Sequence, residues 1–313
     1  MPENRCLDFG VHFHTYHMTV IDPFIINTCE TLNSPEPHVR SYEPKSGHPF
    51  SPFEISDPFG LRNAVVPIFC QHSDGRMFGV GTAFHFDGFN NFLTAYHVVD
   101  FVEKNSDKRP VLFLSMHAVI FGTVCIPPDC FVATSEVKVS RMDADDPMAM
   151  LRGESTHLAL DVALLIPEKI GSGARMPQTV PVRTSGWVPT FGETVLAIGF
   201  PQLDLSEVSH ASQSALLTEG MHGAYGRIVA IHTQGVSRSN PTPVFEVESD
   251  WPPGMSGRPV FNRSGEVVGI VSRSLRADSG HRGTGYAVYI GVVHDIGLFT
   301  ANLDKDNPGW RLC

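Results

Sequence analysis

Charged residues are scarce in this sequence. Asp, Glu, Lys and Arg make up 18% of the 313 residues, whereas soluble globular proteins average about a quarter. The formal net charge of -10 at pH 7 leaves no excess of positive charge, and no local basic patch stands out. The sequence therefore provides no electrostatic basis for binding nucleic acid or an anionic membrane surface.

Long hydrophobic runs are also missing, since no apolar segment approaches the roughly 20 residues of a membrane-spanning helix. The N-terminal MPENRCLDFG has neither the basic nor the apolar region of a signal peptide. The cysteines follow no framework spacing. They are Cys6, Cys29, Cys70, Cys125, Cys130 and Cys313. These absences predict a cytoplasmic protein with free thiols.

Glycine and proline are abundant, with 28 and 24 residues, and they separate many short apolar runs. Such punctuated runs predict an all-β protein built from antiparallel barrels or sandwiches. Residues 95–104 and 292–303 each favour a short helix. The expected strands lie within residues 64–70, 78–86, 90–99, 111–116, 161–167, 194–201, 226–232, 243–249, 257–262, 265–272 and 284–293.

Periodicity divides the chain into regions. Residues 1–60 are rich in proline and poor in apolar periodicity, which predicts an extension that packs on the main domain or is partly mobile. The strand-rich region 61–300 is expected to form that domain, with an acidic, exposed loop insertion at 125–157. Residues 301–313 form a tail.

The segment WPPGMSGRPVFN holds one serine, Ser256, on a constrained turn before an apolar strand. Gly254 allows the backbone to turn so that its amide and that of Ser256 point at one spot, where they could hold an oxyanion. Gly257 removes side-chain bulk beside the hydroxyl. The alternative is an ordinary turn serine.

A serine nucleophile needs a base and an orienting acid. His97 follows a strand-like run in NFLTAYHVVD, and Asp161 is a single carboxylate in the apolar LALDVALLIP. Burying Asp161 unpaired would be costly, so a histidine partner is expected. The alternatives are a histidine that caps a strand or lies in the core, and an aspartate at a strand edge that caps a turn. Rival carboxylates in polar surroundings are Asp100, Asp143, Asp145 and Asp146.

The order His97, Asp161, Ser256 is that of chymotrypsin-type proteases. The segments GVGTAF, LTAYHVV, LDVALLIP, GETVLAIGFPQ, PPGMSGRPVFNRSGEVVGIVS and GTGYAV, spread over residues 61–295, resemble the trypsin-fold serine proteases, especially their Deg/HtrA branch. The resemblance implies two six-stranded β-barrels with the active site between them. It also implies a His97 base, an Asp161 orienter, a Ser256 nucleophile and an oxyanion site at the Gly254 and Ser256 amides.

Three features depart from this family. No Ile-Val-Gly-Gly type start precedes the domain, and Met255 stands where zymogens have an aspartate, so proteolytic activation is not expected. Arg258 replaces the usual second glycine, and it either crowds the leaving-group side or reaches toward the cleft. The tail after residue 300 is too short for the PDZ domain that Deg proteases often carry.

Several further residues bear on substrate recognition. Asp250, six residues before Ser256, corresponds to the base of the specificity pocket in the trypsin branch, which predicts cleavage after Arg or Lys. Alternatively, Asp250 lies at the surface or is capped by a nearby arginine, for which Arg273 and Arg276 are candidates. The stretch Ser272, Arg273 and Ser274 resembles the strand that pairs with substrate backbone, and Gly285 is expected to keep the opposite pocket wall open.

We predict no cofactor and no metal. His12, His14 and His17 with Cys6 could bind zinc on a strand, and Cys125 with Cys130 could bridge or bind metal, but neither spacing matches a known ligand set. The predicted function is a regulated intracellular serine endopeptidase of a stress or defence pathway. Protein substrates and a regulatory partner at the N-terminal extension are its expected partners. The alternatives are a catalytically silent or latent module that binds a partner protein through its cleft, and an esterase.

Overall fold

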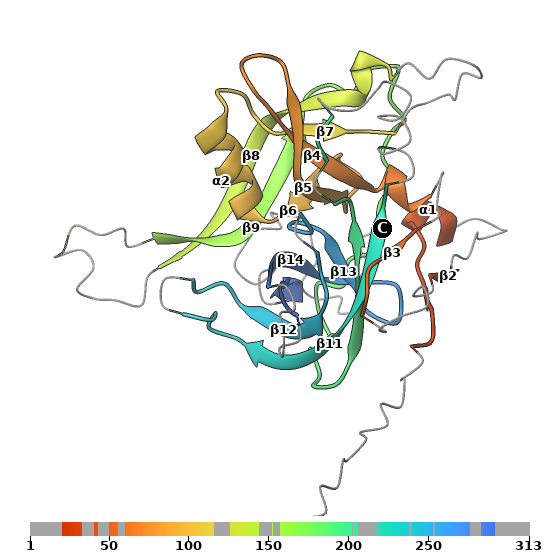
Figure 1. Ribbon diagram of the computed structural model, residues 1–313, viewed down its shortest axis with the longest axis vertical. Coiled ribbons are helices and arrows are strands. Elements are labelled where there is room, and N and C mark those ends of the chain that lie inside the picture. Colours follow the sequence, from red (N-terminus) through yellow and green to blue (C-terminus); the bar gives the residue numbers. More distant parts are fainter. Residues whose placement is uncertain are drawn as a thin grey trace, which may run out of the picture.

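A computed structural model shows two closed β-barrels that follow one another along the chain and meet side by side (Figure 1). The predicted all-β double barrel is confirmed. The residues that the structure describes are 21–32, 41–42, 50–55, 60–115, 126–143, 152, 157–201, 203–205, 217, 220–237, 240–252, 254–275 and 283–291.

The first barrel has the antiparallel order β4-β5-β6-β9-β8-β7. The helix α2 (Tyr96–Asn105) follows β6, as the sequence predicted. Most of these strands coincide with the expected apolar runs, because the inward face of a barrel wall is buried. Their bounds are β4 (Val65–Gln71), β5 (Met77–His85), β6 (Phe92–Thr94), β7 (Val111–Phe113), β8 (Phe131–Asp143) and β9 (His157–Pro167).

Strand β8 corrects the interpretation of residues 125–157 as a loop insertion. Residues 131–143 pair with β7 and β9 and form part of the barrel wall, after the short 3-10 helix η2 (Pro128–Cys130). Val132 is buried whereas Glu136 is exposed. Polar outward-facing side chains dilute the hydrophobic signal of such a half-buried strand, which is why the sequence suggested a loop.

The second barrel has the order β10-β13-β14-β15-β12-β11 and closes through pairing of β10 with β11. A seventh strand from the N-terminal region, β3 (Phe53–Glu54), adds to β11. The expected strands at residues 194–293 are all present. Their bounds are β10 (Thr194–Gly199), β11 (His222–His232), β12 (Val244–Ser249), β13 (Pro259–Phe261), β14 (Val267–Leu275) and β15 (Thr284–Tyr289).

The described part of the N-terminal region packs on the barrels. Phe24 donates its backbone N–H to the Tyr225 hydroxyl at 3.1 Å, and the Glu30 carboxylate accepts from the Thr179 amide and hydroxyl at 3.0 Å. The domain boundary at residue 60 stays a prediction. The elements here are β1 (Phe24–Ile25), α1 (Cys29–Leu32), β2 (Ser41–Tyr42) and η1 (Leu61–Asn63).

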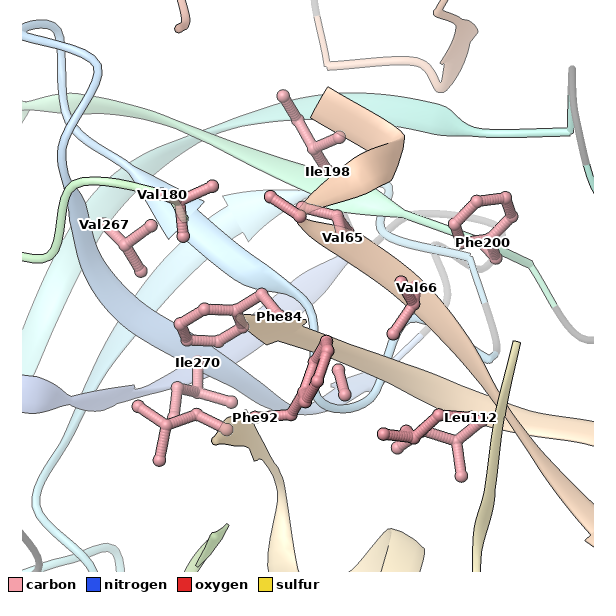
Figure 2. Packing of buried hydrophobic residues seen from close by; sticks show 14 of the residues in the cluster. Val65, Val66, Phe84, Phe92, Leu112, Val180, Ile198, Phe200, Val267 and Ile270 are labelled. Carbon is pink, nitrogen blue, oxygen red and sulfur yellow. The ribbon is translucent and has the colours of Figure 1, made fainter. Parts of the chain in front are cut away.

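One apolar cluster runs through both barrels. Figure 2 shows Phe84 and Phe92 from the first barrel among the same buried side chains as Ile198 and Ile270 from the second. Close-packed interiors transmit displacements rather than absorb them. The two barrels are therefore expected to hold residues contributed from both sides in a fixed geometry.

Two expectations about helices remain. None of the described helices is long and apolar enough to cross a membrane. The helix predicted at residues 292–303 lies outside the described residues.

Candidate active site

His97 lies in the first turn of α2, at the junction of the barrels. The preceding residue Ala95 is extended (φ -77°, ψ 139°), and Val98, Val99 and Val102 bury one face of the helix. Residues spaced three or four apart share a helix face, so this apolar stripe fixes how α2 sits on the barrel. The His97 side chain stays 44% exposed.

Asp161, on β9, holds His97 through both its ring and its backbone. Nδ1 of the imidazole lies 2.9 Å from Oδ1 and 3.0 Å from Oδ2 of the carboxylate. The His97 backbone N–H also donates to Oδ1, at 2.9 Å. First-turn amides have no partner within their helix, so the carboxylate caps α2 while it orients the ring.

The second barrel also contacts Asp161. The Ser272 hydroxyl on β14 donates to Oδ2, and the Asp161 backbone N–H donates to Oγ1 of Thr242 at 2.9 Å. The sequence analysis assigned Ser272 to substrate binding and did not identify Thr242. Neither contact has a sequence signal, because Ser272 and Thr242 lie 111 and 81 residues from Asp161.

These contacts keep Asp161 ionised. Burial by itself would raise the pKa of the carboxyl. The hydrogen bond and charge of His97, the Ser272 hydroxyl and the His97 backbone N–H together outweigh burial and lower that pKa below its ordinary value. The carboxylate can therefore fix Nδ1 as the protonated ring nitrogen and leave Nε2 to accept a proton.

Ser256 lies on a tight turn anchored on both sides. Gly254 and Gly257 have positive φ angles of 82° and 81°, a conformation that favours glycine. Met255 between them is 1% exposed and joins the apolar cluster of the second barrel. The Ser256 carbonyl accepts a hydrogen bond from the Thr82 amide of the first barrel at 3.0 Å.

The hydroxyl of Ser256 bonds to the backbone carbonyl of Ser272, at 3.4 Å. Within the described residues it makes no hydrogen bond to His97, a contact that often tightens only when substrate binds. Neither the Gly254 nor the Ser256 amide donates to another described residue. The structure thus brings the three predicted triad residues to one junction and joins His97 and Asp161 directly.

Arg258 corrects both expectations for this residue. Its side chain is 0% exposed and runs inward, where a Cβ on Gly199 would lie 2.5 Å from the Arg258 Cγ. Among the residues that the structure describes, none forms a hydrogen bond with Nε, Nη1 or Nη2 of the guanidinium. Burial lowers the pKa of this group well below its ordinary value. Arg258 therefore contacts neither the leaving-group side nor a cleft.

The sequence analysis expected Gly285 to keep a pocket wall open, and the structure does not agree. A Cβ on Gly285 would lie 2.3 Å from the Trp251 ring, which is 1% exposed and donates from Nε1 to the Ala224 carbonyl at 3.2 Å. The missing side chain makes room for the indole instead. Asp250 is partly buried and has an interaction partner, and its place at the base of a pocket stays a prediction.

At residues 272–275, one edge of β14 pairs with no other described strand, and we call it the free edge. On one side residues 269–275 pair with β15, whereas β13 on the other side pairs no further than Ile270. Arg273 lies over the Tyr286 ring, with 4.6 Å from its guanidinium carbon to the ring centroid. The proposed partner Arg276 lies outside the described residues.

The expectation of free thiols holds for Cys70 and Cys130, which are buried, but it is wrong for Cys29, which is disulfide-bonded. Among the described residues, no group of three or more His, Cys, Asp or Glu side chains could hold a metal ion. The candidate zinc ligands and the remaining cysteines lie outside the described ranges. They are Cys6, His12, His14, His17, Cys125 and Cys313.

Comparison with known proteins agrees with this arrangement. The family model for the trypsin-like peptidase domain matches residues 81–270, which include His97, Asp161 and Ser256. The chain belongs to the trypsin-like peptidase family. Its predicted resemblance to the Deg/HtrA branch is confirmed by curated relatives named as a DegP-like serine endoprotease and a Do-like HtrA serine protease.

One relative of this trypsin-like peptidase is the "Probable periplasmic serine endoprotease DegP-like" of Pseudomonas savastanoi, 31% identical over 193 residues, which cover 59% of this chain and 35% of that protein. Another is "Serine protease Do-like HtrA" of Bacillus subtilis, 30% identical over 155 residues, which cover 49% and 30% of the two chains. The chain thus spans about a third of the length of these relatives.

Among solved structures, the active form of the Rv3671c protease from M. tuberculosis matches with a TM-score of 0.45 and 17% identity, covering 76% of this chain and 80% of that one. The family assignment rests on the family model and the curated relatives.

Proposed function

We propose that this trypsin-like peptidase is a serine endopeptidase that cleaves protein substrates through an acyl-enzyme intermediate. The observation that carries the proposal is the contact of both Asp161 carboxylate oxygens with Nδ1 of His97. Oδ1 lies at 2.9 Å and Oδ2 at 3.0 Å, beside the anchored turn of Ser256. A merely structural histidine would not need an ionised carboxylate that fixes its tautomer and leaves Nε2 free.

In the proposed first step, the Ser256 Oγ attacks a substrate carbonyl carbon and Nε2 of His97 accepts the hydroxyl proton. The carbonyl oxygen becomes an oxyanion, which the free amides of Gly254 and Ser256 stabilise. Asp161 remains ionised and stabilises the imidazolium. The His97 proton then passes to the leaving amine as the C–N bond breaks, and water attacks the acyl-enzyme by the same route.

The substrate backbone has a matching surface at the free edge of β14. Residues 272–275 can form an antiparallel pairing with an extended segment, which gives affinity through main-chain hydrogen bonds. The preference for Arg or Lys before the cut, predicted from Asp250, gains no support from the packing of Trp251 against Gly285. It stays open to measurement, as do a regulatory partner and a stress or defence role.

One observation favours the alternative of a latent or silent module. The Ser256 hydroxyl is bonded to the Ser272 carbonyl and not to His97, so catalysis requires the hydroxyl to rotate. The cytoplasmic location also stays a prediction without support, because the Pseudomonas savastanoi relative is named periplasmic and disulfides such as that of Cys29 are typical of oxidising compartments.

The test is cleavage of a proteome-derived peptide library by the purified protein, together with labelling by a fluorophosphonate that reacts with activated serines. Ser256→Ala is expected to abolish both signals, and Asp161→Asn to lower cleavage by about 10⁴-fold. The exposed turn residue Ser264 provides a matched control, since Ser264→Ala should leave both signals unchanged. If the wild-type protein gives neither cleavage nor labelling, the proposal is refuted and a binding module is favoured.

A further inference from the structure

The outer face of the second barrel carries a row of polar side chains that ends at Arg273, the residue after Ser272, whose carbonyl accepts a hydrogen bond from Ser256. Arg273 on β14 lies opposite Tyr286 on β15, and Tyr286 lies opposite Glu246 on β12. Glu246 accepts a hydrogen bond from Nε2 of His232 at 3.0 Å. Neighbouring side chains across paired strands interact directly, so the row alternates cation, ring, carboxylate and imidazole.

Arg273 is the last member of this row and is exposed. Its guanidinium carbon lies 4.6 Å from the centroid of the Tyr286 ring. Stacking on a ring positions the guanidinium and leaves its in-plane N–H donors available. No described carboxylate forms an ion pair with Arg273. The row thus presents a positioned cation at the free edge of β14.

The register of a bound substrate follows from Ser256 and Ser272. The Ser256 Oγ lies 3.4 Å from the Ser272 carbonyl oxygen, so the residue whose carbonyl is attacked must lie beside Ser272. An antiparallel substrate runs opposite to β14, which brings the residue before it beside Arg273. Directly opposed residues of two paired strands place their side chains on the same face.

We propose that Arg273 is a specificity-determining residue that selects an acidic side chain at the substrate position immediately before the residue whose carbonyl is attacked. This inference rests on the proposed endopeptidase function and names its substrate class. An Asp or Glu at that position continues the row by one strand and places a carboxylate within reach of the Arg273 donors. A Lys or Arg there meets a like charge.

The experiment uses matched peptides that differ only in Glu, Gln or Lys at this position, built on the best sequence from the cleavage library. For the wild-type protein we expect kcat/KM to be about five-fold higher for Glu than for Gln, the effect of an opposite-charge pair across strands. The ratio should fall as ionic strength rises, because the pair is exposed to solvent.

Two substitutions separate the charge of Arg273 from its packing. Arg273→Gln should bring the Glu-to-Gln ratio to about one, and Arg273→Glu should make Lys the preferred residue. Arg227→Gln is the control, since Arg227 lies on the outer side of β11 and pairs with Glu248 at 2.7 Å. This control removes the same charge from the same barrel and should retain the wild-type ratio.

The outcomes are distinguishable. Cleavage with equal rates for Glu and Gln peptides, or a preference that survives in Arg273→Gln, would overturn this inference and leave the endopeptidase intact. Absence of both peptide cleavage and fluorophosphonate labelling in the wild-type protein would overturn the endopeptidase and the inference with it. A Glu preference lost in Arg273→Gln and kept in Arg227→Gln would support the assignment.

Discussion

Replacing Arg258 with methionine should stabilise the protein. The arginine is 0% exposed, and its three guanidinium nitrogens find no hydrogen-bond partner within the described part of the chain. Removing a charge from water costs several kcal/mol, and only a well-placed partner offsets this cost. Methionine keeps an unbranched apolar stem beside Gly199 and carries no charge.

The expected gain follows from two opposing effects. Exchange of buried charged groups for apolar side chains of similar volume stabilises proteins by up to about 4 kcal/mol, whereas imperfect repacking costs less than about 1.5 kcal/mol. We therefore expect Arg258→Met to raise the free energy of unfolding by about 1–3 kcal/mol. At roughly 2–4 °C per kcal/mol for a domain of this size, Tm should rise by several degrees.

Thermal and urea unfolding provide the measurement, with an unchanged m-value as the sign that only stability changed. Arg263→Met is the matched control: Arg263 is 68% exposed and pairs with Asp22 at the surface, so its loss should change stability by less than about 1 kcal/mol. Because burial lowers the pKa of Arg258, the folded chain releases this proton more readily than the unfolded chain. The free energy of unfolding of the wild-type protein should therefore increase as pH rises, and the difference in that free energy between Arg258→Met and the wild type should become smaller.

A loss of stability of more than about 1.5 kcal/mol in Arg258→Met would refute this reasoning. That result would mean that the guanidinium has a partner in solution and that the methionine leaves this partner unpaired.

Three further predictions concern the site and the core. Ser272→Ala removes a hydrogen bond that lowers the pKa of Asp161, so kcat should fall about ten-fold and its acid limb should move to higher pH; an unchanged pH profile would exclude this positioning role. Gly257→Ala should destabilise far more than Gly75→Ala in urea unfolding, because both have positive φ but only the Gly257 Cβ would meet atoms at 2.2 Å; equal losses would contradict the steric argument. Burial raises the pKa of Cys130 to about 11, so its thiol should stay unreactive toward a disulfide reagent at pH 8 until the protein unfolds, and rapid native labelling would argue against its burial.

The sequence was sufficient to predict the parts of the molecule with a local signal. Apolar runs bounded by glycine and proline marked the strands, and the motifs around His97, Asp161 and Ser256, in that order along the chain, indicated one site. The sequence did not predict strand β8 because its outward residues are polar. It did not predict β3 because two residues carry too weak a pattern.

Contacts between distant segments could not be predicted. The Ser272 hydroxyl reaches Asp161 and the Trp251 ring fills the space above Gly285 only because of how the barrels close. Arg258 misleads for another reason: a charged residue beside a nucleophile suggests a surface role, and only packing shows that its stem enters the core.

Asp161 makes hydrogen bonds with residues of both barrels, and this has a consequence for synthesis of the chain. Translation releases the first barrel, with His97 and Asp161, before β13 and β14 exist, and domains begin to fold as they emerge. Under the proposed function, the nascent chain at this stage carries the base and the acid but not the nucleophile, and β3 cannot pair until β11 has been synthesised. The chain would therefore gain peptidase activity only once β14 is complete, so it would not cleave neighbouring nascent proteins while it is still being translated.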